Sequence, residues 1–237
     1  MNTEMRIAAF IVILLLVADI STQAQGTFQN LAFESATLTV SGDPLQVPFT
    51  NAFPSWTGQL GPYQATEATY NGIAGGFAAI SIIGRNSGSY SNYVIAGNYT
   101  AAISAGFAGT GFVSTAIAET GMTPATAQSI RFAAQLFRSI QNIESLEVTF
   151  AGQLIPIVQL GSGSNFQIYG GDISSFAGMT GELRFTQKPT FASVTTTVLL
   201  DNIQFSTSPI PEPGTFSLIA LGGLFLCLRL RQFSRPA

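Results

Sequence analysis

The sequence predicts an all-β protein, an antiparallel β-sandwich with one apolar segment at each end of the chain. Short runs in the middle of the chain alternate apolar and polar residues, as half-buried strands do. Gly- and Ser-rich turns separate these runs at spacings typical of a sandwich. The two ends instead contain apolar stretches without this alternation. We therefore divide the chain into a leader (1–24), a body (25–208) and a tail (209–237).

The leader has the layout of a secretory signal peptide. A short polar segment, Met1–Arg6, precedes the unbroken apolar run Ile7–Val17. This run is too short to cross a bilayer, which takes about 20 residues. Thr22-Gln23-Ala24 then supplies small residues at the positions of a cleavage site. We predict delivery to the general secretion machinery and removal of residues 1–24; a buried core helix is the alternative.

The body contains several predicted strands. Ala151-Gly152-Gln153 predicts a turn, and Pro156 indicates an edge position or a bulge in the strand that follows. Asp172 is placed to cap a short helical turn over Asp172–Gly178. Ser129–Ile143 fits either period, and we favour a strand. The other predicted strands are Ala78–Ile83, Tyr99–Ile103, Leu146–Phe150, Leu154–Leu160, Glu182–Thr186 and Val194–Phe205.

Composition excludes several classes of function. The chain has no histidine, which removes every His-based triad, His general base and His metal site. It has one cysteine, so neither an intrachain disulfide nor a thiolate zinc site can form. Its nine basic residues form no run, which argues against nucleic acid as a partner. We therefore predict a protein that is not an enzyme.

The tail carries the sharpest motif. Pro211, Glu212 and Pro213 precede an apolar stretch, and we predict a transmembrane helix over about 215–230. Basic residues that follow such a helix stay in the cytoplasm, so the body is expected outside it. The basic cluster consists of Arg229, Arg231 and Arg235.

This tail resembles the PEP-CTERM sorting signal, in which a Pro-Glu-Pro, a short hydrophobic helix and a basic cluster end the chain. The resemblance implies a Gram-negative bacterium with an exopolysaccharide system. It also implies recognition by an exosortase, a membrane transpeptidase that cuts near the motif. An ordinary C-terminal membrane anchor is the alternative.

The body resembles exported PEP-CTERM precursors that have a galactose-binding-like jelly-roll domain. The opening Asn30–Glu34 is similar to their first strand, and Thr123–Phe132 to a turn and strand in mid-domain. Asp172–Gly178 and the closing Leu200–Ser206 complete the similarity. The resemblance implies a jelly roll.

In related carbohydrate-binding jelly rolls, acids on the first and last strands help to hold a structural Ca²⁺, and the matching residues here are Glu34 and Asp201. Alternation places Asp201 on one strand face with Leu199, Ile203 and Phe205. A carboxylate on an apolar face must be paired, hydrogen-bonded or metal-bound. Calcium takes 6–8 oxygen ligands. The alternative is that Asp201 accepts backbone N–H bonds at the end of the sheet, with no cofactor.

Aromatic residues in the first half of the body are candidates for a sugar-stacking platform. Trp56 and Tyr63 are the leading pair, with Tyr70, Tyr90, Tyr93 and Tyr99 in similar Gly/Ser/Asn-rich segments. Sugars stack on exposed aromatic faces, and Arg85 could bond their hydroxyls. Core packing is the alternative for these rings.

We therefore expect a non-catalytic exported protein of the cell surface or the exopolysaccharide matrix. Its precursor would be anchored in the inner membrane before it reaches the cell surface, the outer membrane or the extracellular matrix. A carbohydrate-binding, lectin-like jelly roll is the alternative function, with exopolysaccharide as the partner.

Overall fold

The computed structural model describes residues 26–38, 45–109, 111–137, 145–189 and 195–210. The predicted signal peptide, the Pro-Glu-Pro motif, the predicted membrane helix and the arginine cluster lie outside these residues. Within the described part of the chain, no helix has the length and apolar character needed to cross a membrane.

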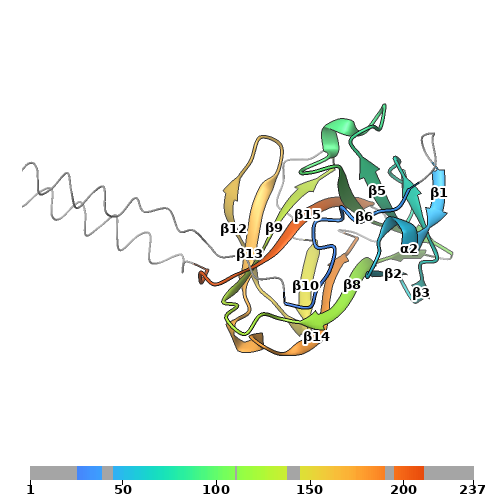
Figure 1. Ribbon diagram of the computed structural model, residues 1–237. Helices are drawn as coiled ribbons and strands as arrows, with labels where there is room; N and C mark the ends of the chain where they lie inside the picture. Colours follow the sequence, from blue (N-terminus) through green and yellow to red (C-terminus); the bar gives the residue numbers. More distant parts are fainter. Residues whose placement is uncertain (1–25, 39–44, 110, 138–144, 190–194, 211–237) are drawn as a thin grey trace, which may run out of the picture.

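Two β-sheets pack face to face, as the sequence predicts (Figure 1). The nine-stranded sheet has the order β1-β4-β5-β6-β15-β9-β13-β12, and β7 pairs with β6. Its strands are β1 Leu45–Pro48, β4 Glu67–Tyr70, β5 Ala79–Gly84, β6 Tyr99–Ala108, β7 Gly111–Val113, β9 Ser129–Leu136, β12 Ile157–Ser162, β13 Gln167–Asp172 and β15 Thr196–Ser206.

The six-stranded sheet has the order β11-β10-β14-β8-β2-β3. Its strands are β2 Thr57–Leu60, β3 Tyr63–Gln64, β8 Thr115–Met122, β10 Leu146–Phe150, β11 Gln153–Leu154 and β14 Thr180–Gln187. The described helices are single turns, α2 Phe49–Ala52, η1 Ser91–Tyr93 and η2 Ser174–Phe176. The all-β sandwich prediction is therefore confirmed.

One apolar core fills the space between the sheets. Many of its large side chains are phenylalanines, and several of these contact each other edge-on or tilted, such as Phe132 with Phe185 and Phe28 with Phe205. Burying a side chain of this size stabilises a fold by roughly 1.5–3 kcal/mol. Phe33, Phe53 and many aliphatic side chains complete this core. A core of this size accounts for the high apolar and low charged content of the chain.

The strands with the clearest alternation form where the sequence predicts them. β10 alternates buried and half-buried residues along its whole length and pairs with β14. Ala151 and Gly152 both have positive φ, 49° and 78°, and form the tight turn between β10 and β11. Two-residue hairpin loops need such dihedrals. The predicted strand Leu154–Leu160 is interrupted at Ile155 and Pro156, between β11 and β12, because proline cannot donate to a ladder.

Two other predictions need adjustment. Ser129–Ile143 forms a strand only over Ser129–Leu136 among its described residues, and 138–144 lie outside them. The predicted N-cap Asp172 lies one residue too early, because η2 begins at Ser174 and its N-cap residue is Ile173; Asp172 still accepts a hydrogen bond from Ser174 N at 2.8 Å.

The predicted first strand at Asn30–Glu34 is wrong. These residues form turns, since Asn30 and Phe33 have φ of 51° and 58° and Phe33 N donates to Asn30 O.

The nine-stranded sheet is not wholly antiparallel as predicted, because β4 and β5 pair in parallel. Local sequence does not reveal strand direction, since both arrangements bury similar residues.

A bulge in β15 changes which residues face the core. The pairing of β15 with β9 shifts between Asp201 and Gln204, and Asn202 has a φ of 51°. Leu200 and Ile203 both belong to the core between the sheets, so the alternation reverses at the bulge. The predicted common face of Leu199, Asp201, Ile203 and Phe205 is therefore wrong, because an extra residue in a strand turns later side chains to the other face.

A second apolar layer covers the outer side of the large sheet. Leu199, Ile83, Ala102 and Val94 form this layer, and half-buried aromatic side chains pack against it. The segment Arg85–Asn98, between β5 and β6, supplies most of that cover. We call this segment the covering loop.

Candidate functional site

Two carboxylates hold the end of the covering loop. Asp201 Oδ2 accepts hydrogen bonds from Thr100 Oγ1 at 2.7 Å and from Ala96 N at 3.1 Å. Its Oδ1 accepts from Asn202 N at 2.6 Å. Ala96 lies in the covering loop, Thr100 lies at the start of β6, and Asn202 lies in the bulge itself. The bulge thus places Asp201 where it ties the covering loop to β15.

Glu34 acts on the next residues of the same loop. Its Oε1 accepts from Asn98 N at 2.7 Å and Tyr99 N at 3.1 Å, and its Oε2 accepts from the Asn98 side chain at 3.0 Å. Arg85 also contributes, since its Nε donates to Gly97 O at 2.7 Å. Glu34 and Asp201, predicted as a pair, are thus brought to one loop. We call them the clamp carboxylates.

The two clamp carboxylates differ in burial. Asp201 is fully buried, and burial raises its pKa to about 7. Hydrogen bonds from Thr100, Ala96 and Asn202 act in the opposite direction, and the charge of Glu34 adds to the rise. Burial also raises the pKa of Tyr99, with the charges of Tyr70 and Glu34 as further causes. Both shifts favour the neutral form of the group concerned, whereas Glu34 is exposed to solvent.

The clamp carboxylates do not have the surroundings of a calcium site. Ca²⁺ takes oxygen ligands whose lone pairs point at the ion. Here each of the four carboxylate oxygens already accepts a hydrogen bond, and backbone N–H groups supply most of the donors. Among the described residues, no group of three or more acids, cysteines or histidines could hold a metal ion. The donor set favours the alternative, that Asp201 accepts backbone N–H bonds.

A cleft lies at the other end of the sandwich, where β1, β4 and β5 approach β2 and β3. Its volume is about 270 Å³, and its walls combine apolar residues with amides and hydroxyls. Gln46 Nε2 donates to Thr69 Oγ1 at 3.0 Å. Among the lining residues, Glu67 supplies the one acid. The lining residues are Gln46, Leu60, Gln64, Ala65, Thr66, Glu67, Thr69, Ala78, Ala79 and Ile80.

Tyr63 lies beside this cleft, whereas Trp56 does not form a platform with it. Tyr63 is 66% exposed and pairs with Leu60, which lines the cleft. Trp56 is only 4% exposed and packs against Phe33 and Phe185, with its ring N–H donating to Asn30 O. The prediction that Trp56 stacks on a sugar is wrong, because its faces are covered by other rings.

The remaining tyrosines of the predicted platform have mixed surroundings. Tyr90 and Tyr93 form an aromatic triangle with Phe137 and lie half-buried over the second apolar layer. Tyr70 and Tyr99 are half-buried and pack against the main core. Most of these rings therefore serve packing, which the sequence analysis held open as the alternative.

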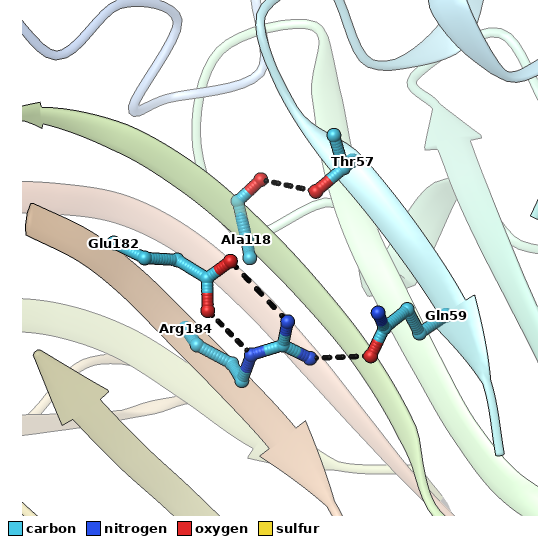
Figure 2. A network of polar contacts seen from close by, with 5 residues as sticks. All are labelled: Thr57, Gln59, Ala118, Glu182 and Arg184. Carbon is cyan, nitrogen blue, oxygen red and sulfur yellow. Dashed lines mark hydrogen bonds and ion pairs between the residues drawn. The ribbon is translucent and has the colours of Figure 1, made fainter. Parts of the chain in front are cut away.

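The outer face of the small sheet carries a polar network (Figure 2). Arg184 donates from Nε to Glu182 at 2.8 Å and from Nη1 to Gln59 Oε1 at 2.7 Å. Thr57 Oγ1 donates to Ala118 O on the strand between them. The guanidinium lies over the buried Ala118, whose small side chain leaves room for it. Because Arg184 is already paired with Glu182 and Gln59, its guanidinium is not a free cation for an anionic ligand.

Glu119 on β8 is a further buried acid, and sequence analysis did not select it. It is 5% exposed, and its Oε1 accepts from Gln29 N at 2.7 Å. Its Oε2 has no hydrogen-bond partner among the described residues. Burial raises its pKa to about 7, and the bond from Gln29 acts in the opposite direction. In the sequence Glu119 follows an apolar run, and nothing local reveals that it faces inward.

Sequence analysis also missed the cleft. Its polar residues come from strands of both sheets, and no local spacing joins Gln46 to Gln64 or Thr69. For the clamp, the resemblance selected Glu34 and Asp201, but no local pattern showed that both acids would bond to the covering loop.

Comparison with known protein families identifies a motif in the tail of the chain. Residues 209–232 match the PEP-CTERM protein-sorting motif. This chain carries a PEP-CTERM sorting motif. The match includes the predicted Pro211, Glu212 and Pro213 and most of the arginine cluster, so the resemblance of the tail is confirmed. The motif indicates exosortase-dependent sorting of an exported protein.

No curated protein matches the sequence. A solved structure of the carbohydrate-binding module TmCBM61 in complex with β-1,4-galactotriose is similar to this chain at 9% identity. The alignment covers 77% of this chain and 98% of the module, with a TM-score of 0.35. We therefore describe the architecture of the body from its own strand pairing and not from this similarity.

Proposed function

We propose that this protein is a non-catalytic component of the cell surface or the exopolysaccharide matrix, which an exosortase cuts near its tail motif. The match of residues 209–232 to the sorting motif carries this proposal. The signal-peptide pattern of residues 1–24 agrees with it, since both ends then serve export. The precursor would be anchored in the inner membrane of a Gram-negative cell until it is cut.

Two properties of the body support a role without catalysis. The chain has no histidine, so proton transfer near neutral pH would fall to acids. Glycoside hydrolysis by a pair of acids needs two carboxyl groups about 5–9.5 Å apart across a cleft. The cleft described above is lined by Glu67 without a second acid. Glu119 and Asp201 are buried, and these two acids and the exposed Glu34 all accept hydrogen bonds from the protein's own backbone.

The test of sorting uses the full chain in a strain that has the exosortase and in the same strain without it. Mass spectrometry of the mature protein is expected to find a shortened C-terminus in the first strain and the intact tail in the second. Glu212→Ala should reduce the cut, whereas Glu182→Ala on the small sheet should leave it unchanged. An intact tail in both strains would refute the proposal.

The second candidate function is carbohydrate binding at the cleft. Amide and hydroxyl groups of Gln46, Gln64 and Thr66 can bond sugar hydroxyls, and Tyr63 offers an exposed ring next to them. Small-ligand sites commonly combine an apolar wall with a few such polar groups. A binding site here would take a neutral polysaccharide, since Glu67 is the one charged group of the lining.

This candidate is tested by calorimetric titration with the exopolysaccharide of the source strain. Tyr63→Ala and Gln64→Ala are expected to weaken binding at least tenfold. Gln159→Ala, an exposed glutamine on β12, is the matched control and should bind as the wild type does. Binding that survives both cleft substitutions would exclude the cleft as the site.

A further inference from the structure

The folded body extends to the edge of the sorting motif. β15 ends at Ser206, and Pro211 begins the Pro-Glu-Pro sequence only a few residues later. In Figure 1 the end of β15 lies beside β9 and β13. The residues between the strand and the Pro-Glu-Pro sequence, Thr207–Ile210, are described, and we call them the exit segment.

Hydrogen bonds tie the start of the exit segment to β9. Ser129 Oγ donates to Ser208 O at 2.7 Å, and Ser208 N donates to Ser206 Oγ at 3.1 Å. Ser206 itself pairs with Ser129 in the sheet, and Ser206 O accepts from Gln128 N at 2.8 Å. Ser129 is fully buried, so the exit segment begins in the body rather than in solvent.

An apolar contact ties the end of the exit segment to β12 and β13. A β-carbon built on Gly170 would lie 2.8 Å from Ile210 Cδ1 and 2.7 Å from Leu160 Cδ1. The absence of a side chain at Gly170 therefore makes the space that Ile210 and Leu160 occupy. Both ends of the exit segment are thus attached to the same sheet.

A segment of the chain that is to be cut must first break its contacts with the folded body. Proteolytic enzymes act on segments that are exposed or that open locally, and the rate follows the population of the open form. Peptide bonds before Ile210 are held by the contacts to Ser129 and Gly170, whereas the bonds that follow are beyond the last of these contacts.

We propose that the contacts of the exit segment with β9 and β13 restrict the sorting cut to peptide bonds that follow Ile210. The mature protein then keeps the whole exit segment, and β15 keeps its C-terminal support. This inference rests on the proposed function, since it concerns where the exosortase cuts. It adds a role for Ser129, Gly170 and Ile210, none of which belongs to the Pro-Glu-Pro sequence; of the three, Ile210 lies within the matched residues 209–232.

The experiment measures the intact mass of the mature protein from the strain that has the exosortase. The wild type should end at Ile210 or at a later residue. Ser129→Ala and Ile210→Ser each remove one contact of the exit segment and should move part of the cut toward the body, giving products shorter than the wild type. Ile168→Ser on β13, an exposed residue of the same hairpin, is the control and should give the wild-type mass.

The outcomes separate the two proposals. A wild-type product that ends at Pro209 or earlier overturns this inference and leaves exosortase sorting in place. Products of Ser129→Ala and Ile210→Ser with the wild-type mass also overturn it, because the contacts would then not restrict the cut. An uncut tail overturns the proposed function and this inference together. Thermal unfolding of each purified variant shows whether the body is folded.

Discussion

Asp201 and Glu119 are both buried acids with a pKa raised by burial to about 7, but the protein surrounds them differently. Both oxygens of Asp201 accept hydrogen bonds, from residues of two separate segments and from the bulge. Glu119 has one bonded oxygen and one without a partner among the described residues. A buried acid therefore stabilises the fold where donors surround both of its oxygens, as at Asp201. It destabilises the fold where one oxygen is buried without a donor, as at Glu119.

The largest effect is expected from removing the clamp. Asp201→Ala leaves the Thr100 hydroxyl and the N–H groups of Ala96 and Asn202 without their acceptor, and each unsatisfied buried group costs about 1–3 kcal/mol. The free energy of unfolding should fall by about 3 kcal/mol in urea unfolding. Asp172→Ala is the control, because this exposed acid accepts one backbone bond, from Ser174. Equal losses in both variants would show that Asp201 is no clamp.

A methyl group at Gly97 is expected to disturb the clamp from the other side. Gly97 has a φ of 55°, and a β-carbon there would lie 2.1 Å from Glu34 Oε1. Gly97→Ala should lower the free energy of unfolding by about 2 kcal/mol, since left-handed backbone alone costs roughly 1–2 kcal/mol for other residues. Gly109→Ala isolates that backbone cost, because Gly109 has a φ of 62° with nothing within 4 Å. If the two variants lose the same stability, Glu34 can move aside.

The two acids should also give the protein a common pH dependence. The pKa of Glu119 is raised in the folded state from 4.5 to about 7, so the folded state binds the proton more tightly than the unfolded state does. The resulting stabilisation is complete below about pH 4.5 and is lost as the pH rises through 7. Asp201 acts in the same direction, from 3.8 to about 7. Urea unfolding should therefore show higher stability at pH 5 than at pH 8.

Glu119→Gln is the substitution that separates the two acids. The neutral amide avoids the cost of a buried charge, so the variant should be more stable than the wild type at pH 8, by about 1–2 kcal/mol. At pH 5 the two proteins should be nearly equal. Glu67→Gln, at an exposed acid, is the control and should keep the wild-type profile. A variant less stable than the wild type at pH 8 would mean that Glu119 has a charged partner.

The smallest effect is expected from calcium. Because the clamp oxygens are occupied by hydrogen-bond donors, an excess of chelator should leave the melting temperature unchanged, and calorimetry should detect no uptake of Ca²⁺. A rise in melting temperature with Ca²⁺ that Asp201→Ala abolishes would refute this and restore the metal hypothesis for Glu34 and Asp201.

The β-sandwich and the tail motif were both predictable from the sequence for the same reason. The patterns that indicate them involve residues close together along the chain. Alternation in β10 and β14 shows directly which residues are buried, and the turn at Ala151-Gly152 is encoded by adjacent residues. Trp56 was misplaced because an aromatic residue in a Gly/Ser-rich segment has the same sequence signal whether it is covered or exposed. Its cover, Phe33 and Phe185, comes from distant parts of the chain.

The sequence by itself determined the β-rich class of the body and the sorting motif of the tail, because both depend on residues that are neighbours along the chain. Tertiary structure alone decided the side of the sheet to which Asp201 turns, the clamp it forms with Glu34, the cleft, and the attachment of Ile210 over Gly170. A bulge of one residue reverses every later side chain of a strand. Contacts between distant segments form only when the whole sandwich closes.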